Sequence, residues 1–181
     1  MNIRKVRGAL THEEVGRIMH VWHHSERIGL PFTVMITQSP PDIDRTAPKE
    51  RMRILRATLN AYCAFARRNG FKGNYLWVRE IRPDGTGEHF HIVAHVPARR
   101  VRHFIAQAQM RRPFPEIEVR RVYEYSHADR YGRWLSALTY LIKQMTPQAR
   151  WKYRLPRRPS GHLAGKRYGM SRNLMQCSRS D

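Results

Sequence analysis

The chain has 181 residues, which is enough for one domain with a hydrophobic core. Its 34 Lys and Arg residues and 14 Asp and Glu residues give a formal net charge of +20, which favours a polyanionic partner, DNA or RNA, over a membrane. We find no apolar run long enough to span a bilayer, no lipidation motif and no secretory signal segment. The two cysteines, Cys63 and Cys177, form neither a CxxC pair nor a disulfide framework, so the expected location is a reducing cytoplasm.

The first half of the chain predicts a helix, a strand and a second helix. The first helix should begin at Thr11, because Thr11 and Glu14 form the Thr-x-x-Glu pattern of a capping box. Apolar residues then follow at helical spacing: Val15, Ile18, Met19 and Trp22. A strand is expected over residues 32–38, and a long helix over about residues 46–69 that ends at Gly70.

The second half of the chain predicts a hairpin and three further elements. Strands at about residues 74–82 and 88–96 are joined by PDGTG, which is a strong hairpin signal. A helix from Pro97 to about Arg111 comes next. It is followed by a strand at about residues 116–125 and a helix at about residues 131–145.

The order β-α-β-β-α-β from residue 32 onward predicts an α+β fold with a ferredoxin-like split βαβ sheet. An N-terminal helix, a following helix that carries a tyrosine, and a basic C-terminal extension are added to it. We expect one domain over residues 1–181, with a core at about 30–147 and a partly irregular extension at 148–181 that contacts nucleic acid. Two helices should cover one face of the sheet and leave the other face open.

A metal site is predicted on the hairpin. His89 and His91 alternate with apolar residues in a strand, so both imidazoles point to one face. Glu80 lies on the preceding strand, and either of two pairing registers places it beside the histidines, opposite His91 or opposite His89. Nitrogen and oxygen ligands with open positions suit Mg²⁺ or Mn²⁺, although imidazoles also accept Zn²⁺ or Ni²⁺. Whether His95, one strand pair further along, contributes stays open, and Glu88 is expected to cap the strand or lie on the rim.

Tyr140 is an unusual residue of the last predicted helix. At about 100° per residue it falls about 155° from the middle of the apolar cluster, so it does not belong to the core. Lys143 follows at i+3, close enough to share a site with it. A tyrosine beside a cation and a metal can attack a phosphate and form a covalent phosphotyrosine. The alternative interpretation is that Tyr140 is an ordinary surface tyrosine.

Four segments resemble motifs of the HUH endonuclease superfamily, specifically the rolling-circle replication initiator (Rep) proteins of plasmids and phages. FTVMITQ (32–38) resembles their first motif, and HFHIVAH (89–95) resembles their His-hydrophobic-His metal strand. TYLIKQM (139–145) resembles their Tyr-x-x-Lys motif, and GKRYGMSRNL (165–174) resembles a basic segment near the end of bacterial initiators. The order of these motifs on a matching pattern of elements strengthens the resemblance.

The resemblance implies a metal-dependent, site-specific nick in single-stranded or hairpin DNA at a replication origin, with Tyr140 joined to the new 5′ phosphate. His89, His91 and Glu80 would hold Mg²⁺ or Mn²⁺, and Lys143 would assist at the phosphate or position the metal. No Walker A loop is present, so a separate host helicase is the expected partner.

The sequence departs from many phage initiators in one respect. They carry a second tyrosine one turn away, where this chain has Ser136 or Gln144, so a single-tyrosine mechanism is implied.

Two other functions remain open from the sequence. A small single-tyrosine HUH transposase would use the same residues on different DNA ends. A non-catalytic module would instead bind single strands through aromatic side chains on the open sheet face. Tyr75 and Trp77 could form that platform only if their strand had the opposite parity to the one that we assign.

Overall fold

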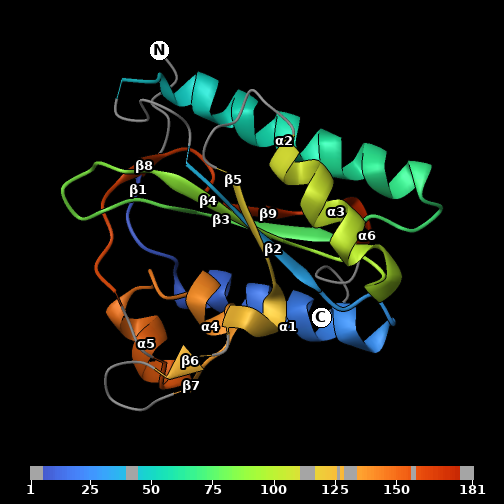
Figure 1. The fold of residues 1–181 in the computed structure, drawn as a ribbon. Helices are drawn as coiled ribbons and strands as arrows, with labels where there is room; N and C mark the ends of the chain where they lie inside the picture. The colour runs from blue at the N-terminus through green and yellow to red at the C-terminus, as the bar shows by residue number, and fades with distance from the viewer. Residues whose placement is uncertain are drawn as a thin grey trace.

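The computed structural model describes residues 6–39, 45–110, 117–125, 127–128, 134–155 and 158–175. These residues form an α+β fold in which a five-stranded antiparallel sheet lies between helices (Figure 1). The strand order is β5-β2-β4-β3-β9, which is broadly compatible with the predicted ferredoxin-like arrangement. The five strands are β2 (Val34–Gln38), β3 (Tyr75–Glu80), β4 (His89–Ala94), β5 (Ile117–Arg121) and β9 (Tyr168–Met170).

The sequence predicted four of these strands but not β9, which comes from the basic C-terminal extension. β9 pairs antiparallel with β3 at the edge of the sheet, with Gly169 opposite Trp77. A Cβ at Gly169 would lie 2.7 Å from the Trp77 ring, so only glycine leaves room for the indole here. The extension also supplies β8 (Leu163–Ala164), which pairs with β1 (Val6–Arg7), and the short helix α6 (Arg172–Met175).

One face of the sheet is covered by α2 (Pro48–Arg68) and α3 (Ala98–Met110), as predicted (Figure 1). Alternate residues of β3 and β4 point into this layer, among them Trp77, Phe90 and Ile92. Helix α2 ends at its C-cap Asn69, and Gly70 follows with a φ of +67°, which glycine adopts without strain.

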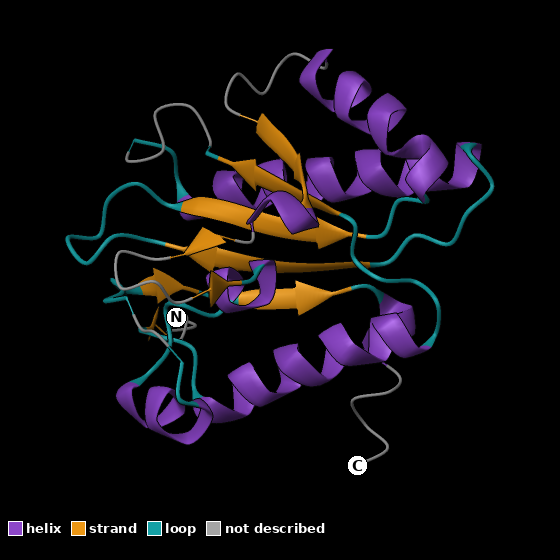
Figure 2. Ribbon diagram, turned by 60° about the horizontal axis from the view of Figure 1, so that its bottom comes forward, coloured by secondary structure: helices purple, strands orange, loops and turns teal. Residues whose placement is uncertain are grey.

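The second face of the sheet is also covered, so the prediction of an open face was wrong. Helices α1 (His12–Arg27), α4 (Ala137–Leu141) and α5 (Pro147–Tyr153) lie on this side, as Figures 1 and 2 show. The strands present apolar side chains to both faces, and Leu76 and Val78 are fully buried under this second layer. These side chains are buried because the helices cover them, and removal of their apolar surface from water stabilises the fold.

Helix α1 begins as the sequence predicted. Thr11 Oγ1 accepts a hydrogen bond from the Glu14 backbone N–H at 3.2 Å, and the Glu14 carboxylate accepts one from the Thr11 N–H at 3.0 Å. This reciprocal pair is the capping box.

The prediction of a helix at residues 131–145 was largely wrong for residues 134–145, which are the part that the structure describes. Strand β7 (Trp134–Leu135) pairs with β6 (His127–Ala128), and α4 begins only after its N-cap Ser136. The helix ends at Leu141, with Ile142 as its C-cap, and the chain beyond it forms hydrogen bonds with a different segment. The carbonyl of Gln144 accepts a hydrogen bond from the Leu10 N–H at 2.9 Å.

The strand predicted at residues 116–125 is shorter in the structure. β5 ends at Arg121, and a 3₁₀ helix, η1 (Val122–Tyr125), follows it. The Glu124 carboxylate accepts a hydrogen bond from the Arg121 N–H at 3.0 Å, which favours the turn over continued pairing.

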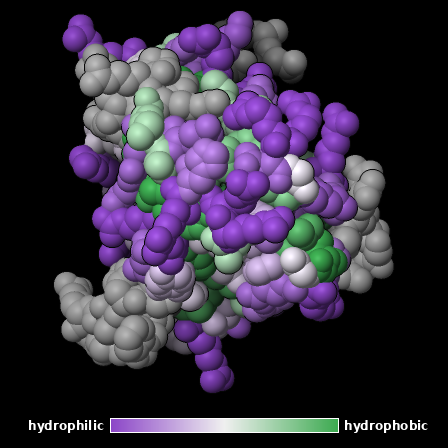
Figure 3. Space-filling view, turned by 45° about the vertical axis from the view of Figure 1, so that its right-hand side comes forward, coloured by the Kyte–Doolittle hydropathy of each residue, from purple (hydrophilic) through white to green (hydrophobic). Residues whose placement is uncertain are grey.

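Hydrophilic side chains cover much of the face that Figure 3 presents, as expected for a strongly charged chain. Among the described residues, no helix has both the length and the apolar composition needed to cross a membrane.

Candidate metal centre and tyrosine site

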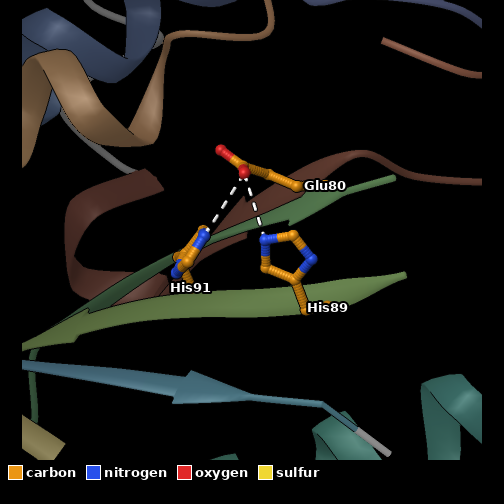
Figure 4. Close-up of side chains that lie close together, drawn as sticks. All are labelled: Glu80, His89 and His91. Carbon is orange, nitrogen blue, oxygen red and sulfur yellow. Dashed lines mark hydrogen bonds and ion pairs between the residues drawn. The ribbon is translucent and has the colours of Figure 1, made fainter. Parts of the chain in front are cut away.

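The hairpin of β3 and β4 brings three predicted ligands together. In its register Glu80 lies opposite His89, and Val78 lies opposite His91. This is one of the two registers that the sequence allowed. The side chains of Glu80, His89 and His91 converge on the sheet face that α1 and α4 cover (Figure 4).

The three side chains are within metal-binding distance of one another. Glu80 Oε2 lies 3.2 Å from His89 Nε2 and 3.3 Å from His91 Nε2, and one ligand atom from each residue lies within 4.8 Å of the others. This is the one cluster of three or more such side chains found among the described residues. The side chain of His89 is 25% exposed, whereas those of Glu80 and His91 are 1% exposed, so the cluster opens toward solvent at His89.

Neighbouring groups orient both imidazoles. His89 Nδ1 lies 3.0 Å from the Gly87 carbonyl oxygen, and its Nε2 faces Glu80. His91 Nδ1 lies 3.1 Å from Thr37 Oγ1 on the neighbouring strand β2. Metal-binding histidines commonly hold their second ring nitrogen in this way. Thr37 was not predicted as a site residue, although the alternation of Met35 and Thr37 in β2 already placed a polar group on this face.

Tyr140 and Lys143 lie against the same cluster. The centroid of the Tyr140 ring is 5.0 Å from that of His91, with an angle of 76° between the ring planes. Lys143 Nζ lies 3.2 Å from the Tyr140 ring centroid and 2.7 Å from Glu80 Oε2. The structure therefore brings together all five residues singled out in the sequence.

Tyr140 is partly buried and faces the sheet, rather than solvent. The helical wheel compared it with residues 134–145, but α4 has only five residues, Ala137–Leu141. Trp134 and Met145 are outside that helix and do not define its apolar side. Tyr140 is nevertheless directed away from a purely apolar environment, toward His91 and Lys143.

Burial and charge control the ionisation of this cluster. Burial would raise the pKa of Glu80, but hydrogen bonds with His89 and His91 and the charge of Lys143 outweigh it and hold that pKa well below its usual value. Burial lowers the pKa of His91 to about 4, so its imidazole is neutral at neutral pH. Burial also lowers the pKa of Lys143 to about 8, in spite of the opposing effect of Glu80. An ionised carboxylate and a neutral imidazole are the forms that bind a metal.

The donor set fits a divalent cation. Glu80 Oε1 is buried and accepts no hydrogen bond from the described residues, although a buried carboxylate oxygen normally has a partner. A cation bound between Glu80, His89 and His91 would satisfy that oxygen and the imidazole nitrogens. Two nitrogen ligands and a carboxylate suit Mn²⁺ and Zn²⁺ and, with added water, Mg²⁺.

His95 does not belong to the cluster. Its Nδ1 lies 2.8 Å from the Pro31 carbonyl oxygen, and its ring packs on Phe71 with the centroids 6.1 Å apart. It lies past the end of β4, where the strand pair no longer holds it over the other histidines.

Glu88 was expected at a strand cap or on the rim, and that expectation was wrong. It is 1% exposed and forms ion pairs with Arg79, at 2.6 Å, and with Arg51 of α2, at 2.8 Å. Arg79 also donates to the carbonyl oxygens of Ala164 and Lys166. The sequence could not predict this ion pair, because the chain has many arginines and no local pattern shows which of them contacts Glu88.

Gln144 and Arg167 form a second buried network that sequence reasoning missed. Gln144 Nε2 donates to the Ile81 carbonyl at 2.8 Å, next to Glu80 in the chain, and Arg167 donates to Gln144 Oε1 at 2.6 Å. These contacts join the segment after Tyr140 to the end of β3, and so hold the two halves of the site together.

Comparisons with protein-family models, with curated proteins and with solved structures find no match for this chain. The family resemblance of its motifs therefore rests on the residues themselves.

Proposed function

We propose that this chain is an HUH-type endonuclease that nicks and rejoins single-stranded DNA and initiates rolling-circle replication. The observation that carries the proposal is the convergence of Tyr140 and Lys143 with Glu80, His89 and His91. These groups come from separate parts of the chain, and each has a chemical role in phosphodiester cleavage. The order of β5, β2, β4 and β3 also supports the ferredoxin-like topology that the family resemblance implies.

Glu80, His89 and His91 would hold the divalent ion, Mg²⁺ or Mn²⁺. Its chemistry when bound is that of a Lewis acid at the phosphate oxygens. His89 is partly exposed, so the cluster is open to a substrate on the side of His89.

Tyr140 is the proposed nucleophile. Its phenolic oxygen would form a bond to phosphorus while the bond from phosphorus to the 3′ oxygen breaks. The phenolic proton is released to water, and the departing 3′ oxygen takes up a proton to become a hydroxyl group. Attack by a 3′ hydroxyl on the phosphotyrosine reverses these changes and joins the strand.

Lys143 is proposed to act on the phosphate charge. Its ammonium group lies between the Tyr140 ring and Glu80, at 3.2 Å and 2.7 Å respectively. A positive charge there is placed to stabilise the negative charge that grows on a phosphate attacked by Tyr140.

The aromatic residues do not favour the binding-module alternative. Trp77 is 7% exposed and packs, together with Tyr75, in the layer of α2 and α3. Neither side chain is on the face of the metal cluster, so they do not form a stacking platform beside it. A transposase of the same superfamily would use the same five residues, and only its DNA target would differ.

The test is trapping of the covalent adduct. The protein is incubated with Mn²⁺ or Mg²⁺ and a pool of single-stranded and hairpin oligonucleotides, and adducts are resolved on a denaturing gel. We expect an adduct that is lost in Tyr140→Phe and kept in Tyr123→Phe, since Tyr123 is 63% exposed and is the matched control for a surface tyrosine. An adduct that persists in Tyr140→Phe, or that forms in EDTA, contradicts the proposal. Sequencing of the trapped DNA separates a replication origin from a transposon end.

A further inference from the structure

Trp151 is the most exposed of the large hydrophobic side chains among the described residues, at 82%. By contrast, Trp22 and Trp77 are buried in the two layers of the core. Helix α5 holds the indole outward because its other side is anchored. Ala149 is fully buried, and the Tyr153 hydroxyl donates to the His12 carbonyl oxygen at 3.1 Å. The exposed indole therefore offers an aromatic surface on which an outside partner can pack, and burial there would be favourable.

The surroundings of Trp151 are strongly cationic. The exposed basic residues near it in the chain are Arg150, Lys152, Arg154 and Arg158. The sequence contains no Asp or Glu between Asp129 and Asp181. The acids on the neighbouring element are Glu13 and Glu14 in the first turn of α1, which packs on α5, and the four basic side chains outnumber them. A polyanion is therefore the partner that this surface complements.

A nucleic-acid strand fits the surface better than an anionic membrane. A helix that lies in a membrane interface needs an apolar face formed by several side chains. In α5, which has seven residues, Trp151 is the single large hydrophobic side chain that is strongly exposed. One aromatic ring among cations is instead the arrangement that stacks on an unpaired base while the cations contact its phosphates.

The surface is joined to the tyrosine site at both ends. Helix α5 begins just after Lys143, with Thr146 as its N-cap. The chain then returns, and the Arg158 backbone N–H donates to the Lys143 carbonyl at 2.8 Å. A strand bound along α5 would thus lie close to Lys143 and Tyr140.

We propose that Trp151 stacks on a base of single-stranded DNA whose phosphates contact Arg150, Lys152, Arg154 and Arg158. The choice of DNA rests on the proposed function, and the stacking contact itself does not require cleavage. The surface would hold the strand next to the nicking site without reading its sequence, because every base has an aromatic face.

The experiment compares two oligonucleotides of equal length, dT₁₂ and a strand in which most bases are replaced by abasic residues. Both carry the same phosphates, so the ratio of their affinities isolates the contribution of the bases. Binding of the full chain is measured by fluorescence anisotropy in EDTA, which removes any dependence on the metal centre. The variants are Trp151→Ala and Trp151→Phe. Met110→Ala is the matched control, since Met110 is 80% exposed and lies on α3, on the other side of the sheet.

We expect Trp151→Ala to weaken binding of dT₁₂ by about fivefold to 100-fold and to leave binding of the abasic strand nearly unchanged. Trp151→Phe should retain most of the preference, and Met110→Ala should retain all of it. An unchanged affinity ratio in Trp151→Ala overturns the proposal, as does failure of the wild-type chain to bind either strand. Loss of binding to phosphatidylserine vesicles in Trp151→Ala, with the ratio unchanged, would assign the surface to a membrane.

Failure of this inference is distinguishable from failure of the proposed nicking activity. Tyr140→Phe should keep the Trp151-dependent affinity ratio whether or not an adduct forms with the wild-type chain. If the adduct depends on Tyr140 but the affinity ratio is unchanged in Trp151→Ala, the proposed nicking activity stands and the proposed stacking surface is rejected.

Discussion

The Glu80 carboxylate is the residue on which the candidate metal centre depends. It contacts His89, His91 and Lys143 through one oxygen, and its second oxygen is buried without a donor among the described residues. We expect Glu80→Gln to weaken Mn²⁺ binding at least about tenfold, because the amide removes the one negative charge of the ligand set. Calorimetric titration of Mn²⁺ measures this, with Glu118→Gln as the control, since Glu118 is an exposed carboxylate of β5. Equal affinities in the two variants would exclude Glu80 as a ligand.

Lys143 should weaken metal binding at the same site, because its positive charge repels a bound cation. Its ammonium lies 2.7 Å from Glu80 Oε2 and so competes for the carboxylate. Lys143→Met should therefore tighten Mn²⁺ binding while it suppresses adduct formation. The two quantities are measured by calorimetry and by the denaturing gel. Weaker metal binding in this variant would show that Lys143 supports the site rather than competes with the ion.

At the scale of elements, the hairpin of β3 and β4 sets the geometry of the site through its register. The sequence allowed two registers on the correct face, and the ion pair of Arg79 with Glu88 is formed in the observed one, on the opposite face from the cluster. A buried carboxylate between Arg79 and Arg51 is satisfied only when these strands are in place. The pair thereby couples the α2 layer to the position of Glu80 and His89.

We expect Arg79→Met to lower the free energy of unfolding by about 3–5 kcal/mol, because it leaves Glu88 buried with one of its two partners. Urea denaturation measures the change. Arg53→Met is the control, since its pair with Glu50 is on the exposed side of α2 and should contribute nothing measurable. A similarly small effect of both variants would show that the buried pair does not stabilise the hairpin.

Tyr62 joins the same elements at their other end. Its oxygen lies 2.7 Å from the His95 carbonyl oxygen and 2.9 Å from that of Asn74, which share its one proton, and it accepts from the Asn74 N–H at 3.0 Å. Burial raises the pKa of Tyr62 above its ordinary value, chiefly because the phenolate would lose its hydration. The contribution to stability is therefore complete below about pH 10, where the unfolded phenol keeps its proton, and is lost as the pH rises further.

Tyr62→Phe should lower the free energy of unfolding by about 1–3 kcal/mol at neutral pH, since it leaves the Asn74 N–H without its buried acceptor. The fall in stability between pH 9 and pH 11 should also be smaller in the variant than in the wild-type chain. Urea midpoints at these two pH values provide the measurement. Parallel declines in both proteins would mean that Tyr62 does not ionise on unfolding.

At the scale of the whole molecule, the net charge of +20 is the feature that should govern binding of the proposed DNA substrate. Phosphate contacts should supply most of the affinity, so binding must weaken steeply as salt rises. We expect single-stranded DNA to bind equally well in EDTA and in Mg²⁺ at constant ionic strength, whereas the adduct forms only with the metal. Anisotropy over a salt series and the denaturing gel separate these two functions. DNA binding that disappears in EDTA would show that the metal, rather than the basic surface, holds the strand.

The sequence by itself determined much of this arrangement. The capping box at Thr11, the hairpin signal PDGTG and the alternation of His89 and His91 are local patterns, and local backbone geometry decides their outcome. Alternation along the strand placed His89 and His91 on one face, whereas Glu80 joined them only in two of the possible pairing registers, one of which the structure has. The i+3 spacing of Tyr140 and Lys143 also predicted that these two side chains lie together, and Lys143 Nζ is 3.2 Å from the Tyr140 ring centroid.

Only the tertiary structure decided the rest, because it depends on contacts between distant segments. The covered second face, strand β9 from the C-terminal extension and the short α4 all follow from packing that no local window contains. The same holds for the buried ion pair of Arg79 with Glu88. The chain has 34 basic residues, and the sequence does not show which of them pairs with Glu88. Long-range packing also placed Tyr140, which the helical wheel put outside the apolar cluster, against His91.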